Sequence, residues 1–203
     1  SPIQIDAIPH ILLGKDIVGQ AHTGTGKTAA FGLPVLNQLT GKNAEAVVIV
    51  PTRELAMQVS DELFKFGKFL GINTATVYGG QSYSRQLKLI ETASVIVATP
   101  GRFLDLLKNE HIKIKPKFVI LDEADEMLDM GFLDDIKDIF TYLPEDRQTL
   151  LFSATMPTAI KNLAKTILKE PEFVTITKSD VTNKNITQTF YVVDEKERDD
   201  ALI

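Results

Sequence analysis

The chain has 203 residues, of which 44% are hydrophobic and 24% are charged, a balance typical of one globular α/β domain with a sizeable core. Its formal net charge of −5 excludes a chain-wide basic field, so any nucleic-acid site must be local. The absence of cysteine excludes disulfides, cysteine–histidine zinc sites and thiol nucleophiles.

No apolar run approaches the roughly 20 residues that span a bilayer, and no charged-then-apolar leader opens the chain. We therefore expect a cytoplasmic protein without a membrane partner. The chain opens at Ser1 and Pro2 and closes on the apolar residues 201–203 just as a helical pattern begins. This predicts a fragment that lacks an upstream segment and a downstream domain.

Seven short apolar runs rich in valine and isoleucine are typical of strands buried on both faces, and they cover residues 16–19, 46–50, 74–78, 94–98, 118–121, 149–152 and 173–176. Between them, apolar residues spaced by three or four positions predict crossover helices over residues 31–39, 55–70 and 132–143. Alternating strands and helices predict an α/β fold, with a mostly parallel central sheet flanked by helices on both faces.

Six of these runs are followed by polar or glycine-bearing residues, at 21–28, 51–56, 79–80, 99–102, 122–125 and 153–155. The carboxyl ends of parallel strands meet at one edge of a sheet, and ligands bind outside that edge. For Gly79 and Gly80 alone, an ordinary polar loop is an equally good explanation. All six segments together favour one shared site.

Residues 21–28 form a glycine-rich turn between a predicted strand and a predicted helix. A phosphate cradle needs successive backbone N–H groups at a helix N-terminus, and glycines adopt the backbone angles that this requires. A lysine then offers a charge to the β and γ phosphates, and a threonine hydroxyl can ligate Mg²⁺. The alternative is a turn that only joins strand to helix, and we interpret His22 as a loop residue rather than a metal ligand. The predicted nucleotide-binding residues of this turn are Ala21, Thr23, Gly24, Thr25, Gly26, Lys27 and Thr28.

Three carboxylates follow directly on the apolar run 118–121. Triphosphate hydrolysis requires a cation that bridges the phosphates and a group that orients or deprotonates the attacking water. We expect Asp122 to hold Mg²⁺ through water, Glu123 to act on the attacking water, and Asp125 to hold another loop by hydrogen bonds. The alternative is a set of acidic residues that interact with a helix dipole. The predicted catalytic residues are Lys27, Asp122 and Glu123, and the predicted metal ligands are Thr28 and Asp122.

The sequence Asp122, Glu123, Ala124, Asp125 resembles the signature of the DEAD-box ATP-dependent RNA helicases. The resemblance is to the first, RecA-like P-loop domain of bacterial members, and it covers nearly the whole chain. The other matching segments, in the family's order and approximate spacing, are residues 2–4, 21–28 with the family's alanine in first position, 51–56, 79–80, 99–102 and 153–155.

The resemblance implies ATP and Mg²⁺ as cofactors and RNA as a partner. It implies that Gln4 hydrogen-bonds the adenine edge, and that Ser153 and Thr155 link the ATP site to the RNA site, with Asp125 as their partner. It also implies contacts to RNA phosphates and riboses from Arg53, Gly80, Thr99, Gly101 and Arg102.

The resemblance further implies that residues 1–178 form the helicase ATP-binding domain. Residues 179–203 would form a linker and the opening strand, at 189–193, of a truncated second RecA-like domain. That second domain supplies arginine fingers, so we expect the chain to bind ATP or ADP, to hydrolyse ATP slowly and not to unwind duplexes. A monomer is expected, with dimerisation through residues 186–203 as the alternative.

Two other functions share these motifs. One is an ATP-dependent RNA clamp or ribonucleoprotein assembly factor that holds RNA without unwinding it, and the sequence does not separate it from a helicase. The other is a DNA-directed helicase of a related family, which residues 99–102 and the DEAD sequence disfavour.

Overall fold

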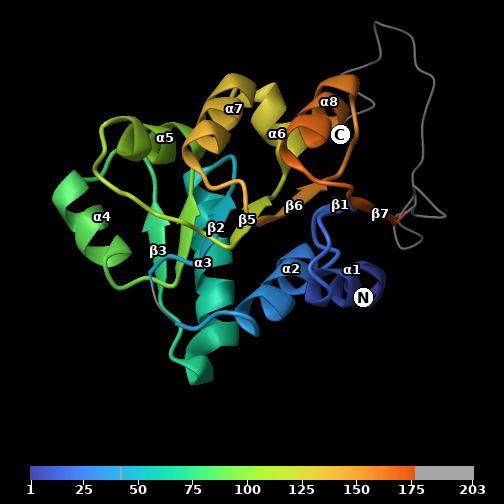
Figure 1. Ribbon diagram of the computed structural model, residues 1–203, viewed down its shortest axis with the longest axis horizontal. Helices are drawn as coiled ribbons and strands as arrows, with labels where there is room; N and C mark the ends of the chain where they lie inside the picture. The colour runs from blue at the N-terminus through green and yellow to red at the C-terminus, as the bar shows by residue number, and fades with distance from the viewer. Residues whose placement is uncertain (42, 177–203) are drawn as a thin grey trace, which may run out of the picture.

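The computed structural model describes residues 1–41 and 43–176, in which strands and helices alternate (Figure 1). Seven strands form one sheet in the order β3-β4-β2-β5-β6-β1-β7, and all neighbours run parallel. The α/β class is confirmed, and this sheet is wholly rather than mostly parallel. The strands are β1 Ile17–Gln20, β2 Ala46–Ile49, β3 Thr74–Val77, β4 Val95–Ala98, β5 Phe118–Leu121, β6 Gln148–Ser153 and β7 Glu172–Thr175.

Helices cover both faces of the sheet, as predicted. Figure 1 shows α1, α2 and α3 on one face and α5 to α8 on the other. The helices are α1 Pro2–Leu12, α2 Lys27–Leu36, α3 Arg53–Gly67, α4 Tyr83–Ile90, α5 Pro100–Lys108, α6 Ala124–Asp129, α7 Leu133–Tyr142 and α8 Thr158–Ile167, with a short 3₁₀ turn η1 at Lys68–Leu70.

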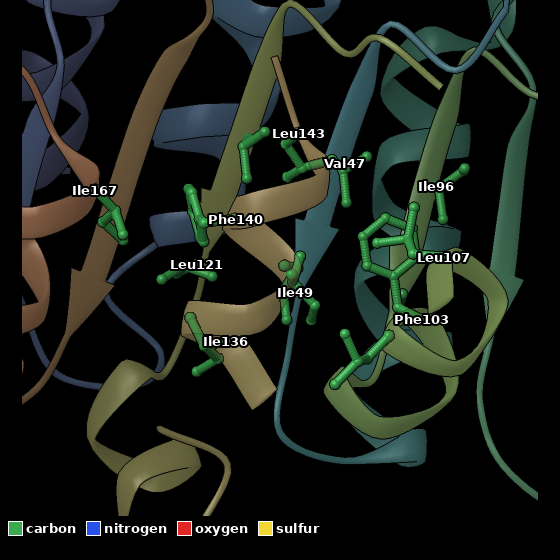
Figure 2. Packing of buried hydrophobic residues seen from close by; sticks show 14 of the residues in the cluster. Val47, Ile49, Ile96, Phe103, Leu107, Leu121, Ile136, Phe140, Leu143 and Ile167 are labelled. Carbon is green, nitrogen blue, oxygen red and sulfur yellow. The ribbon is translucent and has the colours of Figure 1, made fainter. Parts of the chain in front are cut away.

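The core consists of two apolar clusters, one on each face of the sheet. Alternate residues of a strand point to opposite faces, so Val47 and Ile49 of β2 enter one cluster while Ala46 and Val48 enter the other. In Figure 2, the central strands meet α5 and α7, with Phe103 packed among them. The central strands β2, β4 and β5 are buried and apolar throughout, so the polar residues of a site near them come from the loops and helix starts at their ends.

Two details of the predicted elements are wrong. The edge strands are not buried on both faces, since β3 alternates between buried and half-buried residues and Phe173 of β7 is 71% exposed. An edge strand has only one sheet neighbour and less helix cover. The helix predicted over 55–70 ends at Gly67, because the chain tightens into η1 and reaches the left-handed Gly71, which leaves Leu70 59% exposed.

No helix among residues 1–41 and 43–176 is long and apolar enough to cross a membrane. The predicted linker, the strand at 189–193 and the dimerisation segment at 186–203 lie outside the described residues. The domain boundary predicted at residue 178 also lies there and stays a prediction.

Candidate functional site

Strand order divides the carboxyl edge of the sheet into two halves. β5, β6 and β1 are adjacent, so the acidic residues after β5 and the glycine-rich turn after β1 flank the loop after β6. β3, β4 and β2 are adjacent in the other half. The loops and helix starts after these three strands carry the residues that the resemblance assigns to RNA, namely Arg53, Gly80, Thr99, Gly101 and Arg102.

The glycine-rich turn after β1 uses left-handed backbone angles that favour glycine. Gly24 has φ 78° and Gly26 has φ 88°, and α2 begins immediately afterwards at Lys27. Gln4 of α1 contacts this turn, because its Nε2 donates to the carbonyl oxygen of Gly26 at 3.1 Å. A Cβ atom at Gly26 would lie 2.5 Å from that nitrogen. The side chain predicted to recognise adenine therefore fastens the phosphate turn to α1.

Lys27 brings the turn and the acidic residues together. Its Nζ lies 2.7 Å from Glu123 Oε1 and 3.8 Å from Asp122 Oδ1, and the three side chains are 5%, 9% and 4% exposed. The Thr23 hydroxyl donates to the same Glu123 oxygen at 3.1 Å. Nζ forms an ion pair with Glu123, but it makes no well-directed hydrogen bond to any described residue. A buried ammonium with unused donors can bind an anionic ligand.

The two adjacent carboxylates have an unusual backbone and different electrostatics. Burial raises the pKa of Asp122 to about 7; the charge of Lys27 opposes this rise, while that of Glu123 adds to it. Asp122 Oδ1 also accepts a hydrogen bond from the backbone N of Glu123 at 3.0 Å. Glu123 has φ 55°, an uncommon angle for a residue with a side chain. Such strain is concentrated at functional sites, and here it makes the turn from β5 into α6.

Asp125 joins the acidic turn to the loop after β6. Its Oδ2 accepts from the backbone N of Thr155 at 2.9 Å and from the Thr155 hydroxyl at 2.8 Å. Its own backbone N donates to Ser153 Oγ at 3.1 Å. Partial burial acts to raise the pKa of Asp125, but the hydrogen bonds from Thr155 and Ser153 outweigh it and hold the pKa below its usual value. These three residues are in contact, and their role in coupling two sites stays a prediction.

In the other half of the edge, two arginines lie against aromatic rings. The guanidinium carbon of Arg53, at the start of α3, lies 4.7 Å from the centroid of the Tyr78 ring. That of Arg102, in the first turn of α5, lies 4.5 Å from the centroid of the Tyr83 ring. Arg53 is exposed and Arg102 is half-buried. Arginines supported in this way can bind phosphate groups while their side chains stay ordered.

The remaining predicted site residues lie in the loops and helix starts at the carboxyl edge of the sheet. Gly80 and Gly101 are exposed, Thr99 is half-buried, and Gly80 has φ 85°. Thr28 is the second residue of α2 and is half-buried. Thr25 closes the glycine-rich turn, since its hydroxyl donates to the carbonyl oxygen of His22 at 2.7 Å.

Sequence reasoning missed Tyr78, Tyr83 and Gln86, which contact the two arginines. A signal for Gln86 was present. It lies one turn before Ile90 on the buried face of α4, where helical periodicity predicts an apolar residue. A polar residue at such a position indicates a buried hydrogen bond.

A parallel sheet of this order, with the glycine-rich turn and the acidic strand end on either side of β6, defines a P-loop domain of the RecA-like class. The family model described as DEAD/DEAH box helicase matches residues 1–163. The chain therefore belongs to the DEAD/DEAH box helicase family.

Relatives and solved structures agree with this membership. Over its full length, this chain is 58% identical to the DEAD-box ATP-dependent RNA helicase RhpA of Helicobacter pylori. Over the same length, it is 50% identical to the DEAD-box ATP-dependent RNA helicase CshA of Streptococcus pneumoniae. It spans only 42% and 39% of those proteins. A DEAD box protein from Methanococcus jannaschii superimposes with a TM-score of 0.85 at 41% identity, covering 100% of this chain and 55% of that one.

Proposed function

We propose that this domain binds ATP and Mg²⁺ beyond β1 and β5 and RNA phosphates beyond β2, β3 and β4. Joined to a second RecA-like domain, it hydrolyses ATP and separates short RNA duplexes in the cytoplasm. The convergence of Lys27 with Glu123 at 2.7 Å and Asp122 at 3.8 Å carries the proposal. It places a phosphate-binding cation beside the two carboxylates that metal-assisted hydrolysis of a triphosphate requires.

The residues present fit a magnesium ion. Asp122 and Glu123 offer two buried carboxylates against one ammonium, and carboxylate and hydroxyl oxygens are ligands that Mg²⁺ prefers. Among the described residues, no three histidine, cysteine, aspartate or glutamate side chains form a metal site by themselves. Asp122 and Thr28 would therefore hold the ion together with water and nucleotide oxygens. When bound, it would neutralise charge on the phosphates.

Lys27 and Glu123 form an ion pair across the site, and the Lys27 ammonium keeps donors that no described residue uses. A triphosphate offers Lys27 a stronger anionic partner, so we infer that Lys27 exchanges Glu123 for the β and γ phosphates when ATP binds. Glu123 is then free to accept a proton from the attacking water. The Thr23 hydroxyl, 3.1 Å from Glu123 Oε1, would keep that carboxylate oriented after the exchange. Gln4 would bind adenine from α1 while it holds Gly26 of the phosphate turn.

RNA would bind the neighbouring half of the same edge. Arg53 and Arg102 provide local positive charge in a chain whose net charge is −5, with Gly80, Thr99 and Gly101 beside them. Phosphate contacts of this kind position single strands independently of base sequence. We expect the loop after β6 to transmit the state of the ATP site, through contacts among Asp125, Ser153 and Thr155. The same loop also contacts strand β1, because Gln20 Nε2 donates to the carbonyl oxygen of Ala154 at 3.3 Å.

A titration with a fluorescent ATP analogue and Mg²⁺ tests the nucleotide site in this chain. We expect Lys27→Ala to weaken binding by more than about tenfold, because a charge-assisted contact to phosphate is lost. Lys137→Ala is the matched control, since that lysine pairs with Asp134 on the exposed surface of α7. Equal affinities of Lys27→Ala and the unaltered chain would overturn the proposed site.

The complete activity needs the longer protein that carries a second domain. We expect it to displace one strand of a short RNA duplex with ATP, and Glu123→Gln to slow RNA-stimulated hydrolysis at least about 100-fold while ATP still binds. RNA retained under a non-hydrolysable nucleotide without any strand displacement would favour a clamp over a helicase.

A further inference from the structure

The guanidinium group of Arg102 is held from three directions. Its Nη1 donates to the carbonyl oxygen of Gln81 at 2.9 Å and to the side-chain oxygen Oε1 of Gln86 at 3.1 Å. One face of the group lies over the Tyr83 ring at 4.5 Å. The hydroxyl of that tyrosine donates to Asp105 of α5. Three contacts of different kinds leave the side chain little rotational freedom.

Gln86 is the buried member of this set. It is 0% exposed, and its Nε2 donates to the backbone carbonyl oxygen of Tyr78 at 2.7 Å. That contact needs a donor, so it fixes which end of the amide faces Tyr78. The acceptor Oε1 consequently faces Arg102. A buried amide whose two ends are both used has a defined orientation and fixes the position of its partner.

The held guanidinium keeps one edge free. Both hydrogen bonds use Nη1, and neither Nη2 nor Nε donates to a described residue. Arg102 is half-buried, so solvent and ligands reach part of it. The edge formed by Nε and a terminal nitrogen is the part of arginine that binds two phosphate oxygens at once.

Tyr78 connects this arrangement to the second arginine. Its ring supports Arg53 at 4.7 Å and its carbonyl oxygen holds Gln86, while Tyr78 itself is 6% exposed. The two arginines therefore share one rigid buried support at the end of β3. Tyr78 thus links the supports of both arginines before any RNA arrives, and a preorganised site loses less conformational entropy on binding.

We propose that Gln86 is a positioning residue for RNA binding. From beneath the surface it fixes Arg102 so that the free guanidinium edge faces the RNA backbone. This inference rests on the proposed function, in which Arg102 contacts RNA phosphate. Gln86 itself touches no RNA, because it is fully buried.

Fluorescence anisotropy with a labelled single-stranded oligouridylate tests the proposal in this chain at low salt, where phosphate contacts are strongest. We expect Gln86→Met, which keeps the length of the side chain but removes both hydrogen bonds, to weaken RNA binding about fivefold. The dependence of affinity on salt should also become shallower, as it does for Arg102→Ala. In the Arg102→Ala background, Gln86→Met should have no further effect, because it acts only through Arg102.

Gln148→Met is the matched control. Gln148 is also a buried glutamine, and it donates to the carbonyl oxygens of Ile11 at 3.1 Å and Lys15 at 2.6 Å. It is the first residue of β6, so it lies at the amino ends of the strands, away from the arginines. The Gln148→Met variant should therefore be less stable than the unaltered chain but bind RNA with the same affinity. If Gln86→Met does not fold, Gln86→Asn serves instead. This shorter amide cannot reach both partners, so it should weaken binding about threefold.

The outcomes separate the inference from the function on which it rests. RNA binding by Arg102→Ala equal to that of the unaltered chain would overturn both. If Arg102→Ala weakens binding but folded Gln86→Met or Gln86→Asn does not, the inference is overturned and the proposed function stands. An equal loss from the Gln86 substitution in the presence and absence of Arg102 would also overturn the inference, since Gln86 would then act by another route.

Discussion

Asp125 and Thr155 are joined by two hydrogen bonds to one carboxylate oxygen, from the backbone N at 2.9 Å and from the hydroxyl at 2.8 Å. The two residues follow the neighbouring strands β5 and β6, so the pair fixes the acidic turn against the next loop in the sheet. This link joins the turn that carries the proposed catalytic residues Asp122 and Glu123 to the loop proposed to sense them.

A double-mutant cycle measures the strength of that link. We expect Asp125→Ala to lower the free energy of unfolding by about 2 kcal/mol and Thr155→Val by about 1 kcal/mol, with a coupling near 1 kcal/mol. Chemical denaturation gives these values. Thr166→Val is the control, because that hydroxyl bonds within its own helix at 3.0 Å. A coupling of Asp125 to Thr166 as large as that to Thr155 would contradict the assignment.

Lys27→Met leaves two buried carboxylates without their cation. We expect the free energy of unfolding to fall by about 3 kcal/mol at pH 8 in the absence of nucleotide, since an unpaired buried charge is strongly destabilising. The loss should shrink towards pH 5, where Asp122 takes up a proton. Lys137→Met, at an exposed pair, should change stability by less than about 0.5 kcal/mol. A smaller effect of Lys27→Met than of Lys137→Met would refute the buried pair.

Asp122 should make the nucleotide-free domain less stable as pH rises. Its pKa in the folded state, about 7, lies above the ordinary value of 3.8, so the folded state binds the proton more tightly. The stabilising contribution is complete below 3.8 and is lost progressively up to about 7. Asp122→Asn removes this dependence. The stability of the unaltered chain relative to Asp122→Asn should therefore fall between pH 4 and 7, and a constant difference would count against the shift.

Glu45 should show the opposite dependence. Burial acts to raise the pKa of Glu45, but hydrogen bonds from Lys117 Nζ at 2.6 Å and from the Thr40 backbone N at 2.7 Å and hydroxyl at 2.9 Å hold it below the usual 4.5. The stabilisation is thus present above 4.5 and lost as pH falls through the folded-state value. Relative to Glu45→Gln, the unaltered chain should lose stability on acidification. A gain on acidification would show that the partners of Glu45 do not favour its charged form.

Gly19→Ala tests the close packing of β1 against β6. An added Cβ would lie 2.6 Å from two ring carbons of Phe152, whose ring also packs against Phe31 at a centroid distance of 5.5 Å. We expect a loss of about 1–3 kcal/mol in the free energy of unfolding, which Phe152→Leu should partly restore. Gly79→Ala is the control, since its Cβ would meet nothing within 4 Å. Equal stability of the two alanine variants would rule out the tight contact.

Local sequence was sufficient to predict which loops lie together at one edge of the sheet. The glycines of residues 21–28 and the acidic residues after the apolar run 118–121 both predicted ligand-binding loops at strand ends, and those loops lie at one edge of the sheet. Periodicity placed β5 correctly. It failed at Leu70 and Phe173, because the exposure of a residue depends on whether another element covers it, and spacing along the chain does not contain that information.

The side-chain partners inside the site were harder to predict. Gln4 and Gly26 are 22 residues apart, and Asp125 and Thr155 are 30 apart, so no local pattern relates either pair. For Asp125, the resemblance to a family supplied the expectation. Gln86 was missed because no motif includes it; helical periodicity could have indicated that it is buried, but only the tertiary structure shows that its partners are Tyr78 and Arg102.

The sequence by itself therefore determined the class of fold, the glycine-rich turn and the carboxylates, since each depends on backbone freedom or side-chain chemistry over a few consecutive residues. Only the tertiary structure decided that β6 lies between β1 and β5, and that β2, β3 and β4 collect the arginines in the other half of the edge. Strand order is a long-range property, set by how the apolar faces of strands and helices pack together. It is this order that brings Lys27 to Glu123 and keeps Arg102 beside Gln86.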